Sequence, residues 1–80
     1  MTIHLIQGRF EEKEALAIIT KMIDVKVKFH EDKIKHSDNE EDIKMRETRI
    51  KNLQKELYDC QKVLKTYGKS VSIQSDIHLS

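Results

Sequence analysis

The sequence of 80 residues has no proline, two glycines and a single cysteine, Cys60. One cysteine excludes an intrachain disulfide, which suits a reducing compartment. The N-terminal stretch lacks the basic start and long apolar run of a signal peptide. No segment approaches the roughly 20 consecutive apolar residues of a membrane-spanning helix. We therefore expect a cytoplasmic protein without a membrane partner.

Neither sign of charge predominates, because charged residues make up 36% of the chain and yet leave a net charge of only +1. Such a balance gives no general reason to expect nucleic acid as a partner. The four aromatic residues are also too few to form a platform for stacked bases. Binding of nucleic acid through the basic side of the second half of the chain remains the alternative function. That side consists of Lys44, Arg49, Lys51, Lys55, Lys62 and Lys65.

The length predicts one small domain covering residues 1–80. A chain this short buries only about 60% of the surface that its unfolded form exposes, so its stability is marginal. Small domains usually compensate with disulfides, with a structural metal or by oligomerisation. Because the disulfide is excluded, a structural metal or association between copies of the chain remains as the source of added stability.

The glycines stand at positions 8 and 68, and the 59 residues between them contain neither glycine nor proline. Within this interior, SDNEED at 37–42 is the one polar cluster without an apolar residue. Ser37 and Asp38 are each followed three residues later by a glutamate, as in the capping box of a helix start. We therefore expect a turn at 37–39.

The pattern after this turn predicts a helix over 40–67. Gly68, directly after it, is typical of the end of a helix. Along the segment, residues recur at alternating spacings of three and four, which is the heptad pattern of a coiled coil with one polar member. This seam consists of Ile43, Arg46, Ile50, Leu53, Leu57, Cys60, Leu64 and Tyr67.

The segment DVKVKFHEDKIKH at 24–36 alternates at first like a strand. Read at the helical period, however, residues 10–36 carry two adjacent apolar stripes, and the alternation arises where they interleave. We expect a helix over 10–36, with a strand over 23–30 as the competing interpretation. The first stripe is Leu16, Ile19, Ile23, Val27, His30 and Ile34, and the second is Ala15, Ile18, Met22, Val25 and Phe29.

Both ends of the chain alternate between apolar and polar residues, which predicts strands over 2–7 and 70–79. Ile3 and Leu5 fall on one side of the first strand. In the second strand, which is expected to be the longer one, the apolar side is formed by Val71, Ile73, Ile77 and Leu79.

A turn as short as 37–39 makes the two helices antiparallel neighbours and brings the terminal strands together at the open end of the hairpin. The predicted fold is mainly α within the α+β class: a long two-helix hairpin flanked by two short strands that pair antiparallel, in the order β-α-α-β. Residues whose numbers sum to about 77 face each other. His30 and Arg46 therefore meet in one polar layer of the seam, which fixes the register of the helices or, alternatively, forms a ligand site.

Self-association is the function that the pattern predicts. A two-helix hairpin and a two-stranded ribbon are both marginal alone, and contiguous exposed apolar patches usually mark interfaces. We expect a homodimer or higher oligomer that forms a helical bundle and also docks another protein. The expected interface residues are Ala15, Ile18, Met22, Val25, Phe29, Val71, Ile73 and Ile77.

Chemistry is not predicted by any motif. The histidines match no metal-binding spacing, although pairing of the strands would bring His4 and His78 to one polar face, where zinc binding between subunits is an alternative. Cys60 falls on the seam and is expected to be a buried, inert thiol. With no nucleophile, phosphate-binding loop or evident cleft, we expect neither an enzyme nor a bound cofactor.

Overall fold

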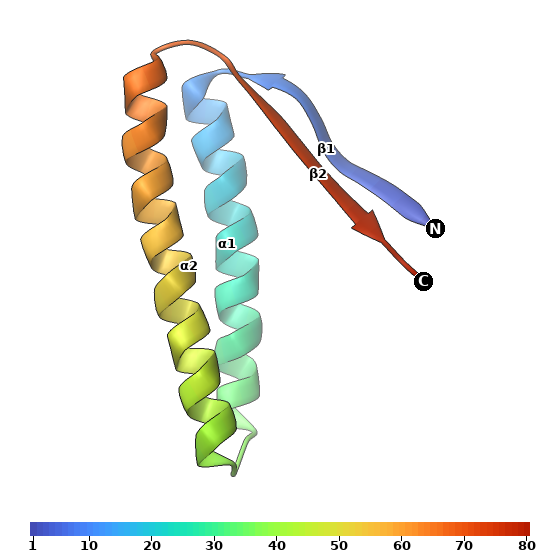
Figure 1. Ribbon diagram of the computed structural model, residues 1–80, viewed down its shortest axis with the longest axis vertical. Coiled ribbons are helices and arrows are strands. Elements are labelled where there is room, and N and C mark those ends of the chain that lie inside the picture. The colour runs from blue at the N-terminus through green and yellow to red at the C-terminus, as the bar shows by residue number, and fades with distance from the viewer.

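The computed structural model describes all 80 residues and has the expected order of strand, helix, helix and strand. Strand β1 spans Thr2–Phe10, helix α1 Glu12–Lys35, helix α2 Glu40–Tyr67 and strand β2 Val71–His78. Figure 1 shows the helices side by side, with the strands leaving the end opposite the loop as a ribbon that carries both termini. The predicted β-α-α-β fold is confirmed.

Helix α2 has the predicted bounds, whereas the boundary between β1 and α1 lies later than expected. β1 continues to Phe10 instead of ending at residue 7, because Phe10 pairs with Val71 across the ribbon. α1 accordingly begins at Glu12 instead of residue 10. The expectation that the second strand is longer was wrong, since β1 has 9 residues and β2 has 8.

The alternating stretch at 24–36 is helical as far as Lys35, so the interpretation as a strand was wrong. Within it, Lys28 contacts the Asp24 carboxylate at 3.0 Å, one helical turn away, which supports the helix modestly. At the start of α1, the backbone N–H of Glu11 donates to the Glu14 carboxylate over 3.1 Å. Local contacts thus agree with the helical period.

Helix α2 begins where predicted, but its capping residue differs. The Asn39 side chain accepts hydrogen bonds from the backbone N–H groups of Glu41 and Asp42, at 2.9 and 3.2 Å. Ser37 and Asp38 stand too early to reach these donors, and the Ser37 hydroxyl instead accepts from the N–H of Asn39 over 3.2 Å. The two predicted capping boxes were therefore wrong, although the helix start was right.

The strands of the ribbon pair antiparallel, with Ile3 opposite Ile77. A β-bulge between His4 and Ile6 leaves Leu5 without a direct partner. Because partners share a face, the bulge brings Ile3 and Ile6 to one side in place of Ile3 and Leu5. We call this side the apolar face, and its cross-strand pairs are Ile3 with Ile77, Ile6 with Ser75, Gly8 with Ile73 and Phe10 with Val71.

The interior of the single chain is thin. Only Ala15, Leu53, Leu64 and His30 are buried, and no large side chain is fully enclosed. The accessible surface is 6548 Å², whereas a compact folded chain of this mass exposes about 5,000 Å². The excess arises because the ribbon extends away from the hairpin and covers little of it (Figure 1).

Candidate interaction surface

The polar layer predicted in the helical seam is present. The Arg46 guanidinium donates from Nη1 to Nδ1 of His30 over 3.0 Å and from Nε to the Asp42 carboxylate over 3.2 Å. A guanidinium only donates hydrogen bonds, so Nδ1 of His30 carries a lone pair and the ring is the neutral tautomer protonated at Nε2. The layer therefore links a residue of α1 to two residues of α2.

Burial is the main cause that lowers the pKa of His30, and the positive charges of Arg46, Arg49 and Lys26 lower it further. A neutral imidazole is thus favoured in the folded chain. A shallow depression of about 170 Å³ lies beside the ring and is lined by Lys26, Arg49, Asn52, Leu53 and Glu56 as well as His30. The alternative of a ligand site in this layer stays a prediction.

Phe29 stands at the edge of the same layer. Its ring meets the His30 imidazole edge to face, with centroids 5.6 Å apart. The charged groups of Lys33 and Arg46 lie 5.6 and 5.9 Å from the ring centroid. Phe29 is nevertheless 55% exposed, so these contacts orient the ring without covering it.

The predicted interface set divides into three groups by exposure. On α1, Val25 is 68% exposed and Phe29 55%, while Ile18 and Met22 are half-buried. We call these four residues the α1 stripe. Ala15 is different, because its side chain is fully buried within the single chain. Its place in the predicted interface was wrong: the residue lies in the first turns of α1, where the chain covers it.

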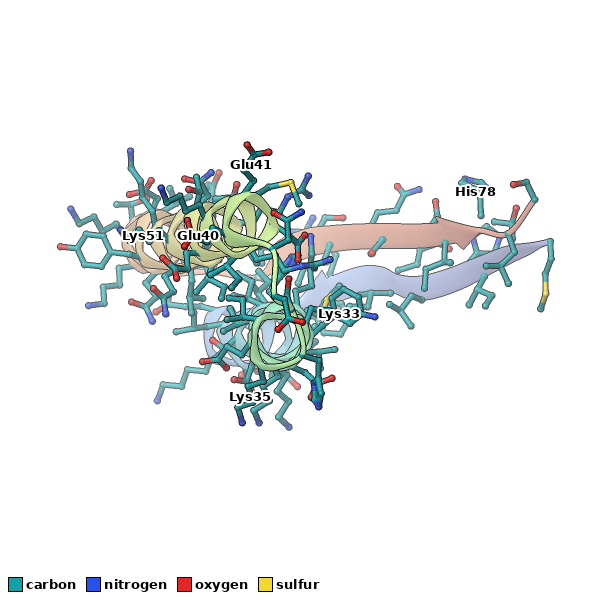
Figure 2. The ribbon with its side chains drawn as sticks, turned by 90° about the horizontal axis from the view of Figure 1, so that it is seen from below. Lys33, Lys35, Glu40, Glu41, Lys51 and His78 are labelled. Atoms are coloured by element: carbon teal, nitrogen blue, oxygen red, sulfur yellow. The ribbon has the colours of Figure 1, made fainter.

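The predicted interface residues of the ribbon, Val71, Ile73 and Ile77, all lie on the apolar face. Their burial shows which way this face is turned. Val71 and Ile73, near the base of the ribbon, are half-buried, and Ile77 near its free end is 38% exposed. The side chains of the polar face between them, Ser72, Gln74 and Asp76, belong to exposed residues. His78, on the polar face, points to the side of the ribbon away from α1 in Figure 2. The apolar face therefore turns toward α1.

A groove of about 330 Å³ separates the base of the ribbon from the helices. Ile73, Gln74 and Ser75 of β2 line one wall. The other wall is formed by Ile19, Met22, Ile23 and Lys26 of α1 together with Leu53 and Glu56 of α2. Beyond this groove the two apolar surfaces diverge, and each continues uncovered. The spacing of apolar residues gives no signal for this angle, which sets how much of each surface stays open.

Eight further exposed apolar residues lie outside the predicted interface: Met1, Ile3, Leu5, Met45, Tyr58, Val63, Tyr67 and Leu79. Met45 is 45% exposed on α2, outside the heptad seam, while Ile3 and Leu79 at the free end of the ribbon are 36% and 54% exposed. Met45 carries a weak signal, since it is an apolar residue that the heptad pattern does not use. The position of Ile3 opposite Ile77 depends on the bulge, for which the sequence offers no clear sign.

The two strand histidines lie on the polar face, as expected, and each is held by a cross-strand partner. Nδ1 of His4 lies 2.9 Å from the Asp76 carboxylate, and Nδ1 of His78 lies 2.9 Å from the Thr2 hydroxyl. No three histidine, cysteine or acidic side chains are grouped so as to hold a metal ion. The free thiol of Cys60 is half-buried at its seam position.

The basic side of α2 is exposed, and part of it contacts a neighbouring aromatic ring. The Lys62 ammonium lies 4.4 Å from the centroid of the Tyr58 ring. Acidic Glu56 and Asp59 stand among the lysines, as on a solvated helix face. Lys51, Lys55, Lys62 and Lys65 nevertheless recur at helical spacing on one side of α2 and are all exposed.

Comparison with known proteins gives no relative: no family model, curated protein or solved structure matches the chain. Neither helix has the apolar length that crossing a bilayer requires.

Proposed function

We propose that the protein is a non-enzymatic, self-associating interaction module whose copies join through the α1 stripe and the apolar face of the ribbon. The observation that carries this proposal is the excess accessible surface of the single chain, roughly 1,500 Å² above that of a compact protein of the same mass. A stable interface buries about 800 Å² on each partner. The excess is large enough for one such interface.

The position of the exposed residues supports the same proposal. Val25 and Phe29 belong to one stripe of α1, and they stay 68% and 55% exposed instead of packing against α2. Large apolar side chains that gather on one surface usually mark an interaction site. Burying them against a second copy contributes about 25 cal/mol for each Å² of apolar surface removed from water. The thin interior of one chain gives self-association a clear energetic benefit.

We propose that the assembled surface also docks another protein, because the free edges of the ribbon offer unpaired backbone groups to an added strand. We also propose a cytoplasmic location, because the lone thiol of Cys60 forms no disulfide.

Light scattering on the purified chain, coupled to size-exclusion chromatography, tests self-association by native mass. The wild-type chain is expected to elute with the mass of a dimer or higher oligomer. Replacing three stripe residues with glutamate, as Met22→Glu, Val25→Glu and Phe29→Glu, is expected to yield monomer. A monomeric wild-type chain, or an unchanged oligomer in the triple variant, would contradict the proposal.

A matched control separates loss of the interface from added charge. Ala17→Glu, Thr48→Glu and Gln54→Glu introduce the same three charges at exposed helix positions outside the stripe. This control is expected to keep the wild-type mass. Should the stripe variant fail to fold, the wild-type melting temperature still tests the proposal, because an oligomer melts at higher temperature as its concentration rises.

A further inference from the structure

The ribbon and α1 begin a contact that a single chain does not complete. At the base of the ribbon, Ile73 of the apolar face lies across a narrow groove from Ile19 and Met22 of α1. Farther out the ribbon leaves the helix, as Figure 1 shows. The apolar face continues to Ile77, and the α1 stripe continues to Phe29, both uncovered.

The two uncovered continuations match in length. From Met22 to Phe29, α1 advances by about 10 Å at 1.5 Å per residue. From Ile73 to Ile77, the ribbon advances by about 13 Å at 3.3 Å per residue. The free part of the ribbon is therefore long enough to cover the free part of the stripe.

The height of the ribbon tip also suits such a contact. Figure 1 shows both chain ends at about the level of the middle of the helical hairpin. If a second copy faces the first, the tip of its ribbon therefore lies level with the middle of α1 in the first copy. This holds whether the helices of the two copies run parallel or antiparallel. Val25 lies near the middle of α1 and Phe29 about one turn farther toward the loop, and both are exposed.

The polar face of the ribbon has less to gain from contact with a second copy. Its side chains bond one another across the strands, with Thr2 to His78 and His4 to Asp76, both at 2.9 Å. Gln74 adds a hydrogen bond to the second oxygen of Asp76 over 3.2 Å. These groups are satisfied in solvent, so the apolar face is the side that gains from a partner.

We propose that the free half of the ribbon of one copy lies across the α1 stripe of a second copy, and that the second ribbon covers the first stripe in return. Such reciprocal contact has two-fold symmetry, the commonest symmetry of homodimers. The partner copy then occupies the space between the ribbon and α1. Ile3 and Ile77 of one copy pack against Val25 and Phe29 of the other. This arrangement rests on the proposed self-association and specifies its geometry.

Cross-linking between two single-cysteine variants tests the geometry. Both carry Cys60→Ser, and one adds Phe29→Cys while the other adds Ile77→Cys. When the two are mixed, re-equilibrated and treated with a short bis-maleimide, a product joining positions 29 and 77 must come from different chains. We expect this product in high yield, identified by mass spectrometry of the joined peptides.

Lys51→Cys in the same background supplies the matched control in place of Phe29→Cys. Lys51 is exposed and points away from the ribbon in Figure 2. The yield with Ile77→Cys is expected to be several-fold lower for position 51 than for position 29. Circular dichroism checks that each variant is folded, and Val25→Cys, at a more exposed stripe position, replaces Phe29→Cys if that variant is not.

The outcomes separate the two proposals. A native mass above that of the monomer together with equal yields at positions 29 and 51 overturns the reciprocal ribbon contact and leaves self-association standing. The same holds if only ribbon-to-ribbon products form, as expected when strand edges join. A monomeric mass at every concentration overturns both proposals.

Discussion

Arg46 and His30 are hydrogen-bonded across the helical seam, with 3.0 Å between Nη1 of the guanidinium and Nδ1 of the imidazole. The two residues are 16 positions apart in the sequence and belong to different helices. Their contact is the only polar layer found in the otherwise apolar seam, and it requires the imidazole to be neutral at Nδ1. The packing of the two helices therefore depends on the protonation state of His30, and hence on pH.

Stability is expected to fall as the pH decreases below about 6.5, the pKa of a solvated histidine. The pKa of His30 is lowered in the folded chain, first by burial and then by nearby positive charges. The unfolded chain therefore binds this proton at higher pH than the folded chain. The stabilisation is complete above the unfolded pKa and is lost as the pH falls toward the folded one.

Urea unfolding at a series of pH values measures this effect in the wild-type chain and in His30→Gln. Glutamine keeps an oxygen that accepts from Arg46 but does not titrate. The difference in unfolding free energy between the two chains is expected to shrink or reverse in acid. Parallel curves over the whole range would show that His30 contributes nothing to the pH dependence.

Asn39→Ala is expected to destabilise the chain by about 1 kcal/mol, because the Asn39 side chain accepts from two N–H groups at the start of α2. The neighbouring Asp38→Ala is the matched control, since the Asp38 side chain makes no hydrogen bond. Thermal and urea unfolding of both variants compare the two positions. A larger loss at Asp38 would favour the cap predicted from the sequence.

Gly68→Ala is expected to cost about 1–2 kcal/mol, because Gly68 ends α2 in the left-handed region with φ of 60°. An added Cβ meets no atom within 4 Å, so the cost comes from the backbone alone. Gly68→Asn should cost less, since asparagine tolerates this conformation better. Equal losses for alanine and asparagine, measured by urea unfolding, would argue against a backbone cause.

Ala15→Leu is expected to destabilise the chain by about 1–3 kcal/mol, because the Ala15 side chain is fully buried and leaves no room for a larger one. Ala17→Leu provides the comparison two residues along the same helix, at an exposed position. That change should stay within about 0.5 kcal/mol of the wild-type chain. If Ala15→Leu were tolerated equally well, the residue would belong to an open surface.

Much of the fold was predictable because it depends on contacts between near neighbours in the sequence. The helical period of 40–67 gave the bounds of α2, and a short turn made the helices antiparallel. From these two features the meeting of His30 with Arg46 followed by simple counting along both helices. The residue that caps α2 was not predicted correctly, because Asn39 caps the helix instead of Ser37 or Asp38.

The candidate surface was predicted in outline and corrected in detail. A second apolar stripe on α1 correctly pointed to Val25 and Phe29 as exposed. The same period placed Ala15 on that stripe, although the folded chain covers it completely. Periodicity assigns a residue to a face of its helix, but it does not say how far a neighbouring element extends over that face.

The order of the elements, the helical seam and the pairing of the terminal strands follow from the sequence, because local periodicity and a short turn leave few alternatives. The bulge at Leu5, the burial of Ala15 and the angle at which the ribbon leaves α1 are visible only in the folded chain. These features arise from contacts between the two ends of the chain and the helices. No pattern within a single segment records how such distant surfaces meet.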